Sequence, residues 1–232
     1  KLKKRPKRNP LIIHYDKIKK ANRDVLLNKK FFKLYENFCP GPLTFVLKKN
    51  KFSKIASSAT ANLNTVAIRF PKNRVIRAVL KQLPFPLAMP SANISSTLSP
   101  VNAFDVFDDF KKKIKIIIND GSSKIGIEST VVDLTGKPKI LRPGIISSSD
   151  IRNCLKVNLS RKKSKLKSPG LLKKHYYPGI PVIIGKKPKK MEHAYIVYGK
   201  KFKNLSNYFN LSKKADLKEA AANLYKTMRK IK

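Results

Sequence analysis

Cationic and short polar side chains outside the predicted helices are the residues of this sequence best suited to chemistry. Lys3, Arg5 and Arg142 supply positive charge on predicted loops or strand ends. Ser91 and Asn93 follow a predicted strand, at the kind of strand end where α/β sheets usually bind ligands. Such a set could bind and neutralise an anion, although cations in a basic opening segment are also typical of a solvated tail.

Other polar residues have ordinary structural interpretations when each is taken alone. Asn9 precedes a proline, as turn residues do, and His14 ends an apolar run, where a histidine is more often structural. Thr65 suits a strand, Arg69 ends that strand as a surface charge would, and Ser99 suits a helix N-cap. The residue types and their spacing leave these alternatives open, and no Ser-His-Asp triad stands out.

Helices and strands mix along the chain and predict an α/β or α+β fold. Apolar and β-branched runs predict strands at residues 11–13, 43–47, 65–69, 87–90, 130–134 and 139–141. The continuous run Ile114–Ile118 predicts a further, buried strand. Helical spacing and capping residues predict helices at 16–21, 29–38, 73–83, 101–110 and 148–155, with Ser99 and Pro100 as N-cap and first residue of the fourth.

A change of composition after residue 156 divides the chain. Residues 157–179 are basic and rich in Ser, Pro and Gly, which predicts a linker between a first domain at 1–156 and a partial domain at 180–232. In that last part we expect strands at Val182–Ile184 and Ala194–Tyr198 and a helix at Asp216–Met228.

The charge balance is strongly basic, with 53 Lys and Arg against 13 Asp and Glu in 232 residues, a net charge of +40. Nucleotides, tRNA and acidic membranes are candidate partners for such a surface. Lysines spread along the whole chain can also reflect genome composition and solubility, and this alternative stays open. Two widely spaced cysteines, Cys39 and Cys154, indicate free thiols in a reducing cytoplasm, with a single disulfide between them as the alternative. No apolar run is long enough to span a membrane.

Several short strings, in one order and spacing, resemble the threonylcarbamoyl-AMP synthase family, in its longer two-domain form with a YrdC-like catalytic domain. The resemblance covers residues 3 to about 178, and the tail resembles the start of that form's small Rossmann-like C-terminal domain. The strings are Lys3-x-Arg5-Pro6, Asn9-Pro10-Leu11-Ile12-x-His14, Pro40-Gly41-Pro42-Leu43-Thr44, Thr65-Val66-Ala67-Ile68-Arg69, Pro90-Ser91-Ala92-Asn93-x-Ser95, Ser99-Pro100, Gly126-Ile127-Glu128-Ser129-Thr130, Leu141-Arg142-Pro143-Gly144 and His175-Tyr176-Tyr177-Pro178.

The resemblance implies a twisted mixed sheet and a nucleotidyltransferase reaction. L-threonine and bicarbonate form a carbamate, which attacks the α-phosphate of ATP, so that threonylcarbamoyl-AMP forms and pyrophosphate leaves. Mg²⁺ would accompany the triphosphate. A downstream threonylcarbamoyl-transferase complex would then modify the adenosine beside the anticodon of tRNA. A non-catalytic module of the same fold that binds tRNA or double-stranded RNA is the alternative.

The resemblance also implies roles for individual residues. Lys3, Arg5, Ser91 and Asn93 would form the catalytic group around the nucleotide. The implied ATP contacts are Arg5, Asn9, Thr65, Ser91, Ser99, Arg142 and Tyr176. The implied L-threonine contacts are His14, Arg69, Met89 and Ser129.

Some positions depart from the family pattern. Ser96 replaces a usual glycine, and Met89 replaces a smaller residue and is expected to narrow the threonine pocket. The family has a Pro-Thr-Glu-Thr-x-Tyr-Gly-Leu motif before the Lys-x-Arg string, and its C-terminal domain continues further. We therefore expect the sequence to be cropped at both ends from a longer protein.

Overall fold

The structure is a computed structural model that describes residues 2–160, 176–185, 192–202 and 205–231. These residues divide into two compact units. The sheet unit holds residues 5–90 and 128–160, and the α7 unit holds residues 2–4, 91–127 and the described residues from 176 onward. The units divide the chain along different lines from the expected domains 1–156, 157–179 and 180–232, and those boundaries stay a prediction.

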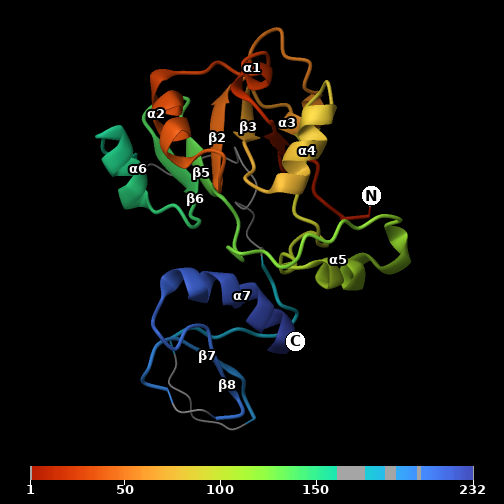
Figure 1. Cartoon of the computed structure of the whole chain (residues 1–232), viewed down its shortest axis with the longest axis vertical. Coiled ribbons are helices and arrows are strands. Elements are labelled where there is room, and N and C mark those ends of the chain that lie inside the picture. The colour runs from red at the N-terminus through yellow and green to blue at the C-terminus, as the bar shows by residue number, and fades with distance from the viewer. Residues whose placement is uncertain (1, 161–175, 186–191, 203–204, 232) are drawn as a thin grey trace. The chain divides into compact units, whose positions relative to one another are not determined.

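A six-stranded mixed sheet forms the sheet unit, with the strand order β4-β1-β3-β2-β5-β6. Figure 1 labels four of its strands, β3, β2, β5 and β6. The β1–β3 and β2–β5 pairs are parallel, and the other three pairs are antiparallel. This confirms the predicted α/β class with a mixed sheet. The strands are β1 (Ile12–His14), β2 (Leu43–Lys48), β3 (Thr65–Arg69), β4 (Leu87–Ala88), β5 (Thr130–Asp133) and β6 (Lys139–Arg142).

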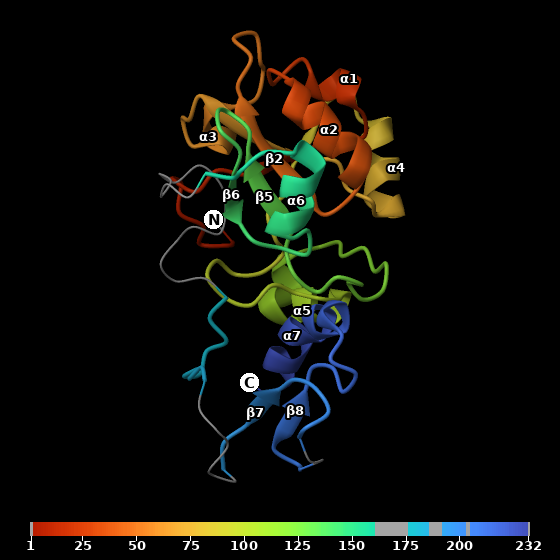
Figure 2. The ribbon, with the colours of Figure 1, turned by 90° about the vertical axis from the view of Figure 1, so that its left-hand side faces the viewer.

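One face of this sheet carries the main core. This face carries Ile13, Phe45 and Ile68, one residue from each of three neighbouring strands. Phe31 of α2 and Ile151 of α6 pack in the same cluster. Figure 2 shows α2 and α6 in front of β2 and β5. The helices of this unit are α1 (Ile18–Ala21), α2 (Lys29–Phe38), α3 (Ser57–Thr60), α4 (Arg74–Gln82) and α6 (Ser148–Leu155).

Local capping explains where the two core helices begin. The side chain of Asn28 accepts a hydrogen bond from the Phe31 backbone at the start of α2. At α6, Ser147 and Asp150 form a reciprocal capping box. Both helices have the bounds that the sequence predicts, because these local signals agree with the apolar spacing.

The α7 unit consists of helices and a small parallel strand pair. Leu98 and Val101 pack against Tyr225 of the long C-terminal helix. The elements are α5 (Ala103–Phe110), the 3-10 helix η1 (Lys111–Lys113), β7 (Tyr195–Val197), β8 (Tyr208–Asn210) and α7 (Leu217–Ile231).

Three predicted elements differ in this unit. The helix expected at 101–110 begins at Ala103, because the side chain of Asn102, rather than Ser99, caps it by accepting from the Asp105 backbone. Residues 114–118 form no strand, and Ile116 is 79% exposed. Residues 182–184 form no strand either, and Ile184 is 92% exposed. Most of the predicted linker, residues 161–175, lies outside the described residues.

Candidate functional site

A row of polar side chains crosses the sheet on the face opposite the main core. In the strand register His14 lies beside Arg69, and Arg69 lies beside Thr44. Paired residues of neighbouring strands point to the same face. A small apolar cluster lies on the same face, because its members are two residues before or after a polar residue of the row on the same strand. These members are Ile12, Val46 and Ala67. The sheet therefore presents its polar row beside an apolar patch.

Ser129 and Arg142 join this row through β5 and β6. The register between these strands shifts by one residue after Val131, so that Arg142 lies opposite Val131 and shares its face. The Arg142 guanidinium donates to the Ser129 carbonyl from Nε (3.1 Å) and Nη2 (2.9 Å), and to Ser129 Oγ (3.0 Å). The Ser129 and Thr44 hydroxyls are 2.7 Å apart. Thr44 is fully buried and was not among the predicted site residues, although it ends the Pro-Gly-Pro-Leu-Thr string.

The two arginines of the row lie close enough to affect each other. Burial, and then the charge of Arg142, lower the pKa of Arg69 to about 10. Arg69 Nε donates to the Gly41 carbonyl at 3.2 Å. Within the described part of the chain, neither arginine forms an ion pair with a carboxylate. Two neighbouring cations with little solvent favour an anionic ligand, because such a ligand would offset both their desolvation and their repulsion.

His14 is neutral in this environment. Burial, followed by the charge of Arg69, lowers the pKa of His14 to about 3 and outweighs the opposing effect of the Ile12 and Leu87 carbonyls. The ring Nδ1 lies 3.0 Å from the Ile12 carbonyl oxygen, to which it donates. His14 can therefore contribute a neutral imidazole to the polar row without adding a third positive charge.

The loop before β1 holds two buried polar atoms that have no hydrogen-bond partner within the described part of the chain. Arg5 Nη2 donates to the Pro10 carbonyl at 2.8 Å, but Arg5 Nε has no hydrogen-bond partner. Asn9 is 4% exposed, and its Oδ1 also has none. Burial lowers the pKa of Arg5. Unpaired buried polar atoms are rare in proteins, so these two point to a ligand with a donor and an acceptor.

Thr65 and Met89 share the face of the polar row but lie away from its end of the sheet. Thr65 begins β3, so it lies on the same face as Arg69 but at the opposite end of the strand. Continuing the parallel β1–β3 register by two residues places Pro10 beside Thr65. Met89 follows β4, and its backbone donates to the Ile12 carbonyl at 3.1 Å.

The α7 unit brings three further predicted residues together. The Lys3 ammonium donates to the backbone carbonyls of Ser91 and Asn93. The Asn93 amide donates to the carbonyls of Ile94 and Thr97, both at 2.9 Å, while its buried Oδ1 has no partner among the described residues. The Lys-x-Arg string thus divides between the units, since Lys3 belongs to one and Arg5 to the other.

Ser99 and Tyr176 also belong to the α7 unit. Ser99 is 8% exposed, and its carbonyl accepts from Arg229 at 3.3 Å. The Tyr176 ring stacks on the Tyr225 ring, with centroids 5.3 Å apart. Ser96, where the family pattern has glycine, adopts a left-handed φ of 75°, which is the conformation that glycine favours.

The described residues hold no group of three or more His, Cys, Asp or Glu arranged to bind a metal ion. None of their helices combines the length and apolar character needed to cross a bilayer. Cys39 and Cys154 are free thiols, as predicted from their spacing.

Two family models match nearly the whole chain. The Sua5/YciO/YrdC model, described as "Telomere recombination", matches residues 1–144. The model described as "Threonylcarbamoyl-AMP synthase, C-terminal domain" matches residues 146–232. Their boundary lies near residue 145, upstream of the expected linker.

Curated proteins and solved structures agree with these models. Threonylcarbamoyl-AMP synthase of Pyrococcus abyssi is 32% identical over 97% of this chain and 72% of its own length. The Bacillus subtilis protein of that name is 35% identical over 82% of this chain, which spans only 57% of that relative. A crystal structure of P. abyssi Sua5 complexed with L-threonine superposes with a TM-score of 0.86 at 32% identity, covering 99% of this chain and 73% of that one. By these matches the chain belongs to the threonylcarbamoyl-AMP synthase family.

Proposed function

We propose that this chain carries the threonylcarbamoyl-AMP synthase activity of its family, converting L-threonine, bicarbonate and ATP into threonylcarbamoyl-AMP and pyrophosphate. The observation that carries the proposal is the Arg69–Arg142 pair, two neighbouring cations without a carboxylate partner among the described residues. The L-threonine in the related P. abyssi structure supports an amino acid as one ligand.

The polar row supplies what threonine binding needs. The Arg69 guanidinium would bind the threonine carboxylate, since its planar fork matches that group. His14 would accept one hydrogen bond at Nε2 as a neutral ring, because its pKa of about 3 keeps it uncharged near neutral pH and its Nδ1 proton is donated to the Ile12 carbonyl. Ser129 would present its hydroxyl, and Met89 would limit the room for the threonine side chain.

The reaction then needs positioning and charge rather than a protein nucleophile. The threonine amine attacks the carbon of bicarbonate, which gives the carbamate and water. A carbamate oxygen next attacks the α-phosphorus of ATP, and the bond from that phosphorus to the bridging oxygen of the β-phosphate breaks. Negative charge grows on the leaving pyrophosphate, which nearby cations stabilise.

We assign the predicted nucleotide contacts within each unit by itself. In the sheet unit we assign them to Arg5, Asn9, Thr65 and Arg142, where Arg5 Nε and Asn9 Oδ1 need partners. In the α7 unit we assign them to Lys3, Ser91, Asn93, Ser99 and Tyr176. We propose that Mg²⁺ enters bound to the triphosphate as part of the substrate, because Mg²⁺ is usually held by substrate phosphates and one or two carboxylates.

The product would pass to a threonylcarbamoyl-transferase complex that modifies tRNA beside the anticodon. Free thiols and an ATP-consuming reaction fit the cytoplasm that we propose as its location. The net charge of +40 favours one further candidate, a non-catalytic module that binds tRNA or double-stranded RNA. The two functions differ in whether threonine drives ATP cleavage.

Pyrophosphate release from ATP, in the presence of Mg²⁺, bicarbonate and L-threonine, tests the proposal. We expect release only when both threonine and bicarbonate are present. Arg69→Gln should raise the KM for threonine by about tenfold or more, because one charge-assisted bond is lost. Arg74→Gln, at an exposed position on α4, is the matched control and should leave that KM unchanged.

Two results would contradict the proposal. The first is a folded wild-type chain that releases no threonine-dependent pyrophosphate, which would favour the RNA-binding module. The second is an Arg69→Gln variant that keeps the wild-type KM for threonine, which would remove the polar row from the threonine site.

A further inference from the structure

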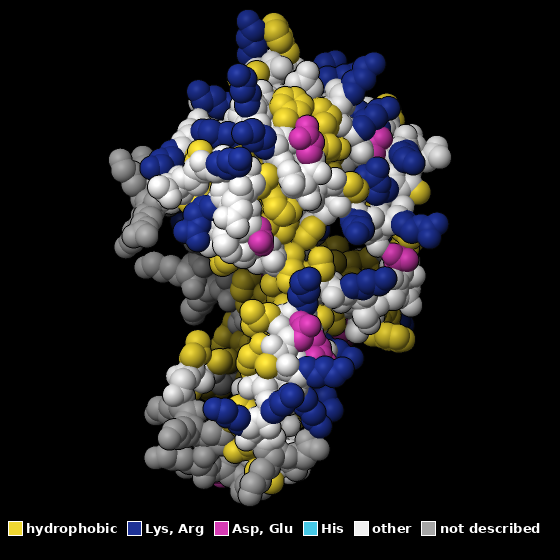
Figure 3. All heavy atoms as spheres, turned by 60° about the vertical axis from the view of Figure 1, so that its left-hand side comes forward, with side chains coloured by type: hydrophobic (Ala, Val, Ile, Leu, Met, Phe, Trp, Pro, Cys, Tyr) yellow, Lys and Arg dark blue, Asp and Glu magenta, His cyan; other side chains and the backbone are white. Residues whose placement is uncertain are grey.

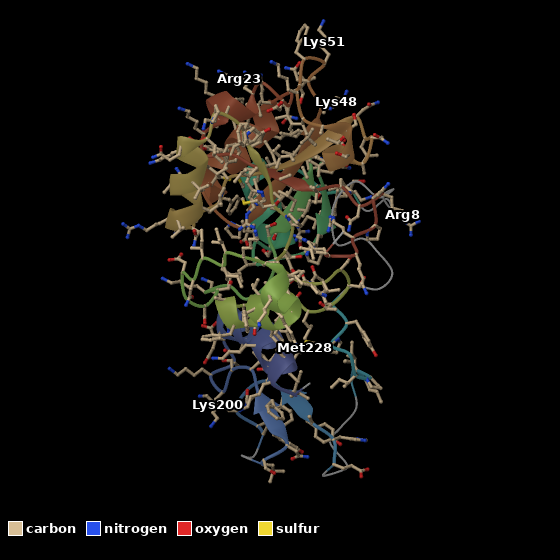
Figure 4. All side chains as sticks on the ribbon, turned by 90° about the vertical axis from the view of Figure 1, so that its right-hand side faces the viewer. Arg8, Arg23, Lys48, Lys51, Lys200 and Met228 are labelled. Carbon is tan, nitrogen blue, oxygen red and sulfur yellow. The ribbon has the colours of Figure 1, made fainter. Side chains whose placement is uncertain are left out.

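Helix α7 packs directly against the segment that carries the predicted nucleotide contacts of its unit. Leu98 and Val101 form one buried cluster with Tyr225, and Leu224 and Met228 of the same helix pack against it. Met228 is labelled in Figure 4 beside α5. A Cβ atom at Gly126 would lie 2.6 Å from the Ala221 carbonyl oxygen and the Ala222 Cα, so the two backbones are in close contact there.

Arg229 connects α7 to this segment through its whole guanidinium group. Its Nη2 donates to the Leu98 carbonyl at 2.8 Å, and its Nε donates to the Ser99 carbonyl at 3.3 Å. The same group pairs with Asp109 of α5 at 2.9 Å. Arg229 and Asp109 are only 15% and 13% exposed, so solvent screens this contact weakly.

A second acid strengthens the arrangement. Asp105 Oδ2 lies 3.8 Å from Arg229 Nε and accepts from the Val101 backbone at 2.7 Å. The Asp105 and Asp109 carboxylates of α5 thus fix the position of the Arg229 guanidinium. That guanidinium in turn donates to the backbone carbonyls of two successive residues, Leu98 and Ser99. A lysine could not reproduce this, because its ammonium is a point charge without a planar fork.

The same helix also holds Tyr176. The Tyr225 ring stacks on Tyr176 at 5.3 Å, with 29° between the ring planes. Tyr177, the next residue, donates from its backbone to the Ser96 carbonyl at 2.9 Å and pairs with Thr97. Two predicted ATP contacts that are 77 positions apart in the sequence, Ser99 and Tyr176, are therefore held by one helix.

We propose that Arg229 is a positioning residue for ATP: with Asp109 it fixes the Leu98–Ser99 backbone, so that α7 sets the affinity for the nucleotide without contacting threonine. Helix α7 lies in the part of the chain that matches the family's C-terminal domain, residues 146–232, whereas Ser99 lies in the part that matches the first family model, residues 1–144. By this inference, a helix of the C-terminal domain positions a nucleotide contact of the preceding domain. The inference rests on the proposed function for its choice of ligand.

Binding of α,β-methylene-ATP, which cannot release pyrophosphate, tests this inference by calorimetry on the whole chain. We expect Arg229→Gln and Arg229→Lys each to weaken binding by about tenfold. The KM for threonine should change less than twofold. Lys226→Gln, an exposed position on the same helix, is the control and should bind the analogue as the wild type does.

Asp109→Asn is a second test variant, which weakens the same contact from α5 and leaves the sequence of α7 unchanged. It should weaken analogue binding in the same direction, and combining it with Arg229→Gln should add little, since both residues act through one contact. Wild-type affinity in a folded Arg229→Lys variant, or an equal loss for threonine and the analogue, would overturn the inference. Analogue binding by a wild type that releases no pyrophosphate would instead refute the proposed function and leave this inference standing.

Discussion

Among the described residues, five buried side-chain atoms have no hydrogen-bond partner, and three of them lie on residues with predicted nucleotide roles. These three are Arg5 Nε, Asn9 Oδ1 and Asn93 Oδ1. Leaving a buried polar atom unpaired costs about 1–3 kcal/mol, so a fold does not keep such atoms without a compensating gain. A nucleotide offers both donors and acceptors, and binding it would recover that cost. We therefore propose that these three atoms contact the nucleotide.

At the residue scale, the lowered pKa of His14 predicts that the stability of the fold depends on pH. Its pKa is about 3 in the folded chain and 6.5 when unfolded, so the unfolded state takes up the proton first as the pH falls. Stability from this residue is fully present above pH 6.5 and is lost progressively between 6.5 and 3. Urea unfolding should therefore give a free energy about 1 kcal/mol lower at pH 5.5 than at pH 7.5 from His14 alone.

His14→Asn is the matched variant for this measurement. Asparagine keeps a donor for the Ile12 carbonyl but does not titrate, so most of the difference between the two pH values should disappear. An unchanged difference in the variant would mean that His14 is exposed to protons in the folded chain.

At the scale of elements, the junction between β6 and the Glu128–Ser129 segment depends on Gly144. A Cβ atom there would lie 2.4 Å from the Thr130 nitrogen and 2.6 Å from the Glu128 carbonyl oxygen. Gly144→Ala should therefore lower the free energy of unfolding by about 2 kcal/mol or more. It should also raise the KM for threonine, because Arg142 and Ser129 lie on either side of this contact.

Gly136→Ala, in the β5–β6 hairpin, is the control, since nothing lies within 4 Å of its Cβ position. It should change stability by less than about 0.5 kcal/mol. Thermal unfolding of both variants decides the point, and equal midpoints would contradict the proposed close packing at Gly144.

Elements with strong local signals could be predicted from the sequence. The helix at 29–38 and the strand at 65–69 have the predicted bounds because capping, propensity and apolar spacing agree there. Ile114–Ile118 and Val182–Ile184 have the same β-branched composition as real strands, yet they stay unpaired in the structure. A strand needs a neighbour, and no local pattern specifies one.

The candidate site was predictable only in part for the same reason. The resemblance named His14, Arg69, Ser129 and Arg142, and the structure brings these four to one face of the sheet. Thr44 was missed because a buried threonine in a strand looks like any β-former. Its place in the polar row depends on the register that places it beside Arg69 and on the one-residue shift that places Arg142 beside Ser129.

At the scale of the whole molecule, positive charge is dispersed. Figure 3 shows Lys and Arg side chains spread over the visible face with few acidic neighbours. Arg23, Lys48 and Lys51, labelled in Figure 4, are exposed and belong to different elements or loops of the sheet unit. A dispersed charge attracts polyanions through counterion release and carries no sequence preference of its own.

Binding of unmodified tRNA at two salt concentrations tests whether the basic surface binds RNA or only keeps the protein soluble. If the lysines and arginines behind the net charge of +40 bind tRNA phosphates, the Kd for tRNA should rise with salt. Two or three phosphate contacts are enough for a rise of about tenfold or more between 50 and 200 mM KCl. Heparin should compete, because the contacts would be electrostatic. Affinity that does not change with salt would require specific base contacts, and no binding at 50 mM would mean that the lysines serve solubility. Threonine-dependent pyrophosphate release, measured at both salts without tRNA, shows that the chain stays folded and keeps any loss of affinity distinct from a loss of structure.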